Sequence, residues 1–358
     1  MHYRSERFWN AAGLCALGAA PTLQGGVMAG VPEAFPLDVI PYEEFVRGDA
    51  STVTRLKKAL YEGGIVGIRG ILTYREKVRA FIEAARAFSM LPDVVKEHYA
   101  PNHALGETFL GYEKGKEKFR RPTGEWVVDT LKASYYGFVP DNQLNKWPTE
   151  VDLKGPFQAL GVLMSETSAA LMQQIGLFDP GVGIPLDGTP RRGVGRMLHY
   201  HKCLEGHEEN PFWCGAHFDH GAFTALLPAF YFVDGEMVPE PTEAGLFVKS
   251  TADGVFRKVV ADDPNVLLFQ VGEFSQLATH DAIRATEHRV HKSTSSVIDR
   301  YTMACFFDPP IDAVIHSYSE LTKDARYGGA AGDPCSFRQW QEASFKRYIV
   351  KEESESGD

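Results

Sequence analysis

The chain has 358 residues, a formal net charge of −10 and a hydrophobic content of 44%. These values are typical of a soluble globular protein with one large domain or two modest ones. The excess of acidic residues argues against nucleic acid or an anionic membrane as the main partner, because both reward clustered lysine and arginine. A small anionic ligand remains compatible, since it needs only one or two basic groups.

The five cysteines are sparse and contain no CxxC pair, so we expect no disulfide framework and a reducing, cytoplasmic location. Residues 1–34 predict a flexible leader, with a cleaved targeting segment as the alternative. Proline and glycine interrupt this stretch, so it is not expected to span a membrane. The C-terminal "KEESESGD" predicts a solvated tail.

The front half of the chain carries mainly helical patterns. "STVTRLKKALYEGG" predicts a helix that begins at its Ser/Thr residues, ends at Gly63–Gly64 and precedes a short apolar strand, "IVGIRG". "LTYREKVRAFIEAARAFSMLP" predicts a second helix, opened by a capping box of Thr73 and Glu76. A third helix over "GPFQALGVLMSETSAALMQQIGLF" has one apolar face, formed by Phe157, Leu160, Met164, Leu171 and Ile175. The stretch 101–150 receives no assignment.

From about residue 190 the pattern changes to short strands. The predicted strands are "RMLHYHK", "AFTALLP", "GLFVKS", "FRKVVA", "NVLLFQVG", "HRVHKS" and "RYTMACFF". Many short, evenly spaced strands indicate a barrel or a double-sheet jelly roll. We therefore expect an α+β fold in which a helical N-terminal half packs against a β-sandwich.

"WCGAHFDHGAFTALL" places His217 and Asp219 two residues apart before an apolar run. In extended backbone, both side chains point to one face while Phe218 points the other way, into the core. A second histidine would complete a 2-His-1-carboxylate set, which suits Fe(II) because it leaves three coordination positions open. His288 and His291, which face opposite sides of one strand, are candidates; His280 lies in a predicted surface turn.

Two other interpretations of the histidine-rich stretch remain open. In the first, the histidines there are exposed or hydrogen-bonded residues without a metal. In the second, a structural zinc ion is held by a set such as Cys203, His207, Cys214 and His217. The spacing of that set lacks the paired short ligand arm of common zinc sites.

Arg300 and Thr302 also stand two residues apart on a predicted strand. A guanidinium binds a carboxylate through two hydrogen bonds and a hydroxyl adds a third, so this pair suits a small dicarboxylate. The alternative is a surface strand with an ion-paired arginine.

The segments "HFDHGAFTALL", "LLFQVGEFSQLATHDAIRATEHRVH" and "RYTMACFF" together resemble the isopenicillin N synthase-like branch of the 2-oxoglutarate/Fe(II)-dependent dioxygenases. The "EHRV" match selects His288 as the partner of His217 and Asp219 in binding iron. Arg300 and Thr302 fall on the Arg-x-Ser position of that family, which implies that they bind 2-oxoglutarate. "GRMLHYHKC" is similar to another family segment and implies that Tyr200 contacts this cosubstrate.

The resemblance implies a double-stranded β-helix (jelly-roll) core over residues 186–315. A helical N-terminal region over 35–185 would pack against it, and 316–358 would form a C-terminal helix and tail. The implied activity is oxidation of a small organic molecule by O2, through hydroxylation, desaturation or ring closure, with release of succinate and CO2. A monomer is expected. The alternatives are an Fe(II) oxidase or oxidative cyclase of the isopenicillin N synthase type, independent of 2-oxoglutarate, and a non-catalytic metal-stabilised binding protein.

The sequence also departs from the family pattern. Leu198 stands where asparagine is usual, so one polar contact to the cosubstrate is missing. Residues 228–243 form an additional segment, expected either to shape the mouth of the active site or to be a neutral surface insertion. Candidates for lining the substrate pocket are Tyr112, Arg120, Arg121 and Trp126, with an exposed basic turn as the alternative for the two arginines.

Overall fold

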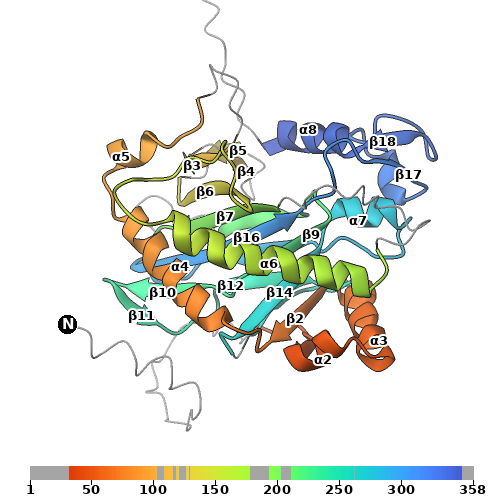
Figure 1. Cartoon of the computed structure of the whole chain (residues 1–358), viewed down its shortest axis with the longest axis horizontal. Helices are drawn as coiled ribbons and strands as arrows, with labels where there is room; N and C mark the ends of the chain where they lie inside the picture. Colours follow the sequence, from red (N-terminus) through yellow and green to blue (C-terminus); the bar gives the residue numbers. More distant parts are fainter. Residues whose placement is uncertain are drawn as a thin grey trace, which may run out of the picture.

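The computed structural model describes residues 32–102, 109–115, 118–120, 126–128, 130–177, 193–202, 211–261 and 263–348. Two antiparallel-rich sheets and a set of helices make up this part of the chain (Figure 1). None of its helices is both long and apolar enough to cross a membrane.

The larger sheet has the strand order β1-β2-β14-β9-β16-β7-β6-β3, with the β10–β11 hairpin attached to β16. Its only parallel pair among the described strands is β1 with β2. The strands are β1 (Val39–Pro41), β2 (Ile65–Arg69), β3 (Gly111–Lys114), β6 (Lys132–Val139), β7 (Gly193–Tyr200), β9 (Phe223–Leu226), β10 (Phe230–Val233), β11 (Glu236–Val238), β14 (Val266–Val271) and β16 (Ile298–Phe307).

The smaller sheet has the order β13-β12-β15-β8 and is antiparallel throughout. Its strands are β8 (Phe212–His217), β12 (Gly245–Lys249), β13 (Phe256–Lys258) and β15 (His288–His291). Two short separate pairs are formed by β4 (Lys118–Arg120) with β5 (Trp126–Val128) and by β17 (Val314–His316) with β18 (Pro334–Ser336).

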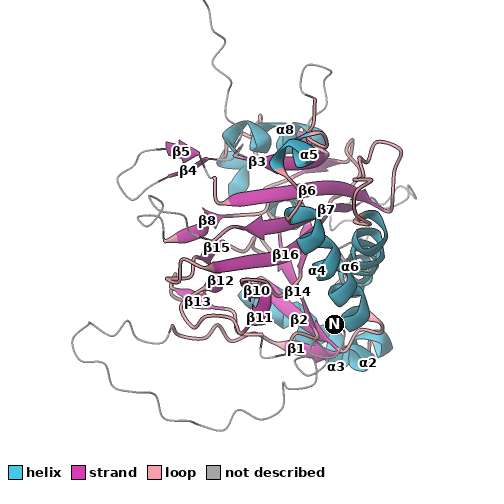
Figure 2. Ribbon diagram, turned by 90° about the vertical axis from the view of Figure 1, so that its left-hand side faces the viewer, coloured by secondary structure: helices cyan, strands magenta, loops and turns pink. Residues whose placement is uncertain are grey.

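The helices fall mainly before residue 175. They are α2 (Tyr42–Arg47), α3 (Ala50–Lys58), a π-helical turn (Ala59–Gly63), α4 (Tyr74–Ser89), α5 (Asp93–Glu97), α6 (Lys154–Gln174), α7 (Glu273–Ala278), a 3-10 turn (Glu320–Lys323) and α8 (Phe337–Tyr348). In the side view, α4 and α6 lie on one side of the larger sheet and the strands of the smaller sheet lie on the other (Figure 2).

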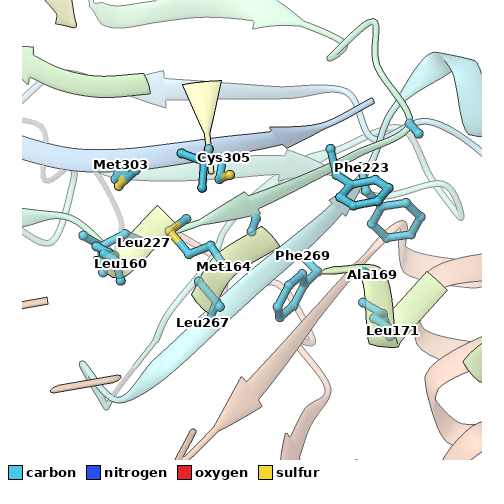
Figure 3. Packing of buried hydrophobic residues seen from close by; sticks show 14 of the residues in the cluster. Leu160, Met164, Ala169, Leu171, Phe223, Leu227, Leu267, Phe269, Met303 and Cys305 are labelled. Atoms are coloured by element: carbon cyan, nitrogen blue, oxygen red, sulfur yellow. The ribbon is translucent and has the colours of Figure 1, made fainter. Parts of the chain in front are cut away.

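Alternation along β16 explains this layering. Met303 and Cys305 point to the helices and share a buried cluster with Leu160 and Met164 of α6 (Figure 3). Ala304 points the other way, into a cluster that also contains side chains of the smaller sheet. Because successive strand residues face opposite sides, one strand contributes to both layers of the core.

The structure confirms the α+β class and all seven predicted strands after residue 190. Helix α6 is also confirmed, and its five predicted apolar residues are buried. The capping predictions were wrong. Asp49, not a Ser or Thr residue, caps α3 by accepting a hydrogen bond from the Thr52 amide. Thr73 has a left-handed backbone with φ 59°, and its side chain makes no cap bond to α4.

The N-terminal half is less purely helical than its pattern predicts. Besides the expected strand β2, it supplies β1, β3 and β6 to the larger sheet, so residues 35–185 share that sheet with the later strands. The segment 132–139 is buried at nearly every position because helices cover one face and the sandwich interior lies on the other. Burial on both faces removes the polar alternation that identifies a strand in sequence.

Leu160→Ala tests the packing of α6 on β16. Leu160 is fully buried in this cluster, so its truncation is expected to lower the free energy of unfolding by about 2–5 kcal/mol. Leu144→Ala, at a residue that is 58% exposed, is the control and should change stability by less than about 0.5 kcal/mol. Chemical denaturation measures both, and equal effects would contradict this account of the core.

Candidate metal centre and anion pocket

His217, Asp219 and His288 converge at one end of the smaller sheet. His217 ends β8, His288 begins the neighbouring β15, and the two are register partners in the antiparallel pair. Asp219 lies in the loop just after β8. Its Oδ1 is 3.8 Å from His217 Nε2 and 3.9 Å from His288 Nε2, too long for hydrogen bonds but suitable for atoms that share a metal ion.

The backbone orients both imidazole rings. His217 Nδ1 lies 2.8 Å from the Gly215 carbonyl oxygen, and His288 Nδ1 lies 3.0 Å from that of Thr286. A carbonyl oxygen only accepts, so each ring carries its proton on Nδ1 and directs the Nε2 lone pair towards Asp219. Histidine ligands in metal sites are commonly fixed in this way.

The charges of the three groups depend on one another. Burial alone would raise the pKa of Asp219, but the adjacent His288 and His217 hold it below its usual value. Burial and the charge of His217 lower the pKa of His288 to about 4. Burial would also lower the pKa of His217, but the Cys214 sulfur and Asp219 raise it to about 9. The cluster therefore provides one carboxylate and at least one neutral imidazole, the state in which these groups bind metals.

Backbone and side-chain donors hold the loop that follows Asp219. The carbonyls of Asp219 and Gly221 accept hydrogen bonds from the first amides of α7, at 2.8 and 3.0 Å. The His220 carbonyl accepts a hydrogen bond from Trp340 Nε1 at 3.0 Å. The Ala222 carbonyl accepts one from the Gly272 amide at 2.9 Å. A Cβ at Gly272 would lie 2.2 Å from the Gly221 oxygen, so only glycine permits this close approach.

The second oxygen of Asp219 is also engaged. Thr224 Oγ1 donates to Asp219 Oδ2 at 2.5 Å, which leaves Oδ1 facing the two imidazoles. Asp308 is partly buried nearby, and desolvation together with the charge of Asp219 raises its pKa to about 7. Its Oδ1 has no hydrogen-bond partner among the described residues.

The other two histidine candidates lie apart from this cluster. His280 is exposed, and His291 lies away from the cluster, stacked on Phe247 with ring centroids 3.9 Å apart. The predicted burial of Phe218 was wrong: its side chain is 37% exposed because β8 ends at His217 and Asp219 belongs to a loop.

The alternative zinc set gains no support from the described residues. Cys214 Sγ lies 3.7 Å from His217 Nδ1, on the opposite side of the ring from Asp219. A metal ion bound by Nε2 of His217 therefore does not face this sulfur. Cys203 and His207 lie outside the described residues.

Arg300 projects into the space between the two sheets and is only 3% exposed. Its guanidinium carbon lies 4.7 Å from the centre of the Tyr200 ring, so the structure brings together two of the three predicted cosubstrate residues. Arg300 Nε donates to the Tyr231 hydroxyl at 3.3 Å, whereas one terminal nitrogen, Nη1, has no partner within the described part of the chain. Glu240, whose charge acts on Arg300, is already engaged, because it accepts from Tyr231 at 2.9 Å and pairs with Lys258 at 2.8 Å.

Thr302 is buried on the same face of β16 as Arg300, as the i, i+2 spacing predicts. Its hydroxyl donates to the Leu227 carbonyl at 2.5 Å, so in this arrangement it can only accept a bond from a ligand. Tyr231 was missed by sequence reasoning, because it lies within the 228–243 segment. Residues 230–233 pair with the first residues of β16, and this pairing places Tyr231 opposite Arg300.

Of the four candidates for lining the substrate pocket, only Tyr112 has a described side chain. Tyr112 is buried on the helix side of the larger sheet, with its ring 5.8 Å from that of Phe88, so its assignment to the pocket was wrong. The reason is strand parity: Tyr112 is register partner of Tyr135, which also points to the helices. Arg121 and the side chains of Arg120 and Trp126 lie outside the described residues.

The fold and the site give two features to compare with known proteins: two facing sheets, and a 2-His-1-carboxylate group at one end of the smaller sheet. No family model matches the sequence. The chain is 25% identical over 261 residues to the 2-oxoglutarate-dependent dioxygenase gloF of Glarea lozoyensis, covering 66% of this chain and 76% of that protein.

Solved structures share the fold. A full-length Neurospora crassa protein in complex with alpha-KG and 5-formyluracil superposes with a TM-score of 0.61 at 20% identity, covering 86% of this chain and 95% of that one. JOX2 in complex with 2OG, Fe and JA gives a TM-score of 0.61 at 19% identity, covering 95% and 96%. The chain is thus similar in sequence to a 2-oxoglutarate-dependent dioxygenase, and it shares the fold of structures solved with alpha-KG or with 2OG and Fe.

Asp308→Asn tests the electrostatics beside the centre. Burial raises the folded pKa of Asp308 to about 7, from an ordinary 3.8, so metal-free protein loses stability as pH rises from the lower value to the higher. The side-chain amide introduced by Asp308→Asn does not titrate, so the variant lacks this pH-dependent loss of stability. At pH 8 the metal-free variant should exceed wild type by about 4 kcal/mol in unfolding free energy, a difference that falls towards zero near pH 4. Denaturation at several pH values measures this, and a pH-independent difference would contradict it.

Proposed function

We propose that His217, Asp219 and His288 bind Fe(II), that 2-oxoglutarate binds with its distal carboxylate on Arg300, and that the enzyme oxidises a small organic molecule. The products besides the oxidised substrate would be succinate and CO2. The observation that carries the cosubstrate assignment is the buried, unpaired guanidinium of Arg300.

The three side chains fit a ferrous ion in chemistry and in geometry. Two imidazole nitrogens and one carboxylate oxygen point to a common centre from one side. A protein that supplies only three ligands leaves half of an octahedral sphere for small molecules. A closed structural zinc site would instead need a fourth protein ligand, and none joins this group among the described residues.

Arg300 fits a carboxylate. A buried cation without a counter-charge is costly, and a bound carboxylate would remove that cost by accepting from Nη1. The Tyr231 hydroxyl fixes the guanidinium by accepting from Nε, and the Tyr200 ring covers one of its faces. Together they present the free edge of Arg300 to the interior of the sandwich.

When bound, the iron and 2-oxoglutarate supply the oxidising chemistry with O2. The chain positions them: backbone carbonyls orient the two imidazoles through Nδ1, while Thr224 restrains the carboxylate of Asp219. Buried side chains between the two sheets, among them Leu198, Trp213 and Val290, form apolar walls that exclude water from much of this region.

The finer fold assignment belongs to the same proposal. Two largely antiparallel sheets packed face to face, with ligands at their rim, support a double-stranded β-helix core. The resemblance of "HFDHGAFTALL" and "EHRV" to family segments supports placement in the isopenicillin N synthase-like branch. We also propose that the protein acts as a cytoplasmic monomer and does not bind nucleic acid, on the basis of its charge and cysteine content.

Removal of a ligand side chain tests the metal centre. Asp219→Ala and His288→Ala should each weaken Fe(II) binding by at least about 100-fold, because each removes one of three protein ligands. Anaerobic equilibrium dialysis measures the affinity. His280→Asn is the matched control, since His280 was a candidate for the same role and is exposed. Unchanged binding in both ligand variants would refute the site.

Arg300→Gln tests the cosubstrate pocket. Loss of a charge-assisted, two-point contact should raise the KM for 2-oxoglutarate at least about 30-fold, while Tyr231→Phe, which removes only the support of Nε, should raise it about 3- to 10-fold. Succinate release measures both.

Arg284→Gln, at an exposed arginine, is the control and should leave this KM unchanged. If Arg300→Gln instead affects only the KM of the organic substrate, the 2-oxoglutarate-independent oxidase becomes the better assignment.

A further inference from the structure

A second group of two histidines and one carboxylate lies on the opposite face of the larger sheet. His199 and His201 stand two residues apart at the end of β7, and Asp299 lies beside them on β16. Their ligand atoms all lie within 4.8 Å of one another. Because Tyr200 and Arg300 point into the sandwich, their neighbours in sequence point to the helix side, away from the ferrous centre.

The geometry of this group closely matches that of the first. The rings of His199 and His201 are 4.0 Å apart and tilted by 51°, compared with 4.2 Å and 54° for His217 and His288. The carboxylate is closer, since Asp299 Oδ1 lies 3.0 Å from His199 Nε2, at hydrogen-bond distance. A metal ion would take the place of the proton that these two atoms share.

One nitrogen of the group has no partner. His201 Nε2 is buried and makes no hydrogen bond in the described part of the chain, and burial lowers the pKa of this histidine to about 3. The ring is therefore neutral and keeps a lone pair available. Asp299 is 28% exposed, which leaves a path from solvent to the group.

The surroundings hold the group in place. The ring of His199 stacks on Tyr301 at 4.3 Å, and the Tyr301 hydroxyl lies 2.8 Å from Ser89 Oγ at the end of α4. Burial lowers the pKa of His199 although Asp299 opposes the shift, and the charges of Lys96 and Lys114 lower it further. Both lysines also pair with a common carboxylate, Asp93, at 2.8 and 3.6 Å, which offsets their charge.

We propose that His199, His201 and Asp299 form a second metal site, selective for a borderline divalent transition ion such as Zn(II). Imidazole nitrogen with one carboxylate oxygen is a donor set for such ions rather than for Mg(II) or Ca(II). Three protein ligands and one water complete a tetrahedral sphere. The bound ion links the ends of β7 and β16, the two strands that carry Tyr200 and Arg300 on their other face.

Zn(II) stoichiometry tests the proposal, with the full chain stripped of metal and equilibrium dialysis followed by elemental analysis. Wild type should bind a Zn(II) equivalent at each centre. Asp219→Ala should lose the first equivalent and keep the second. Adding His201→Phe to that variant should remove the second equivalent, and adding the isosteric Asp299→Asn should weaken it at least tenfold.

His291→Phe in the Asp219→Ala background is the matched control. His291 is another partly buried histidine whose Nε2 lacks a partner among the described residues, but it belongs to neither group of ligands. This variant should retain the second equivalent. Circular dichroism and thermal unfolding identify any variant that has failed to fold, and Asp299→Asn preserves side-chain shape if His201→Phe does fail.

A second equivalent that survives both His201→Phe and Asp299→Asn overturns the proposal, as does an Asp219→Ala protein that binds no Zn(II). Failure of the ferrous assignment would have a different signature. In that case Asp219→Ala would bind as much Zn(II) as wild type. Adding His201→Phe would still remove the Zn(II) equivalent bound at the second site.

Discussion

The site depends on two backbone carbonyls, those of Gly215 and Thr286, each of which binds the Nδ1 proton of the histidine two residues later. These bonds determine which nitrogen of each ring faces Asp219. Without them, either ring could rotate or shift its proton, and the Asp219 carboxylate would pair with an N–H instead of sharing a metal ion with two lone pairs. Ligand geometry is thus supplied by local backbone conformation at the end of β8 and the start of β15.

A second constraint is electrostatic. The fold buries Arg300 without an ion-pair partner in the described residues, yet it supports the guanidinium with a hydroxyl and an aromatic face. Such an arrangement is unfavourable for stability by itself and becomes favourable when an anion binds. Glu240, whose charge also acts on Arg300, is held by Tyr231 and Lys258 instead.

Strands β7 and β16 serve both faces of the larger sheet. One set of alternate residues, including Tyr200 and Arg300, lines the proposed cosubstrate pocket, and the other set includes His199 and Asp299. The two proposed metal centres therefore lie on opposite sides of the larger sheet. Neighbouring residues of β7 and β16 point towards one centre or the other. An ion that restrains the ends of these strands on one face also restrains the pocket on the other.

The 228–243 segment shows what the sequence leaves undecided. Its residues are compatible with a role in shaping the active site and with a neutral insertion. In the structure its β10–β11 hairpin pairs with β16, and this pairing places the Tyr231 hydroxyl within hydrogen-bond distance of Arg300. No local pattern identifies this role, because it depends on which residue of β10 lies opposite Arg300.

The sequence by itself determined the α+β class, the later strands, α6, and the pairs His217/Asp219 and Arg300/Thr302, because these rest on short-range periodicity within one element. The choice of His288 needed a resemblance to known proteins, since strand parity separates His288 from His291 without saying which faces the pair. Tertiary structure alone decided the convergence of His217 with His288, the support of Arg300 by Tyr231, and the grouping of His199, His201 and Asp299. Each of these contacts joins strands distant in sequence, and their pairing register is set by packing of the whole core rather than by local residue patterns.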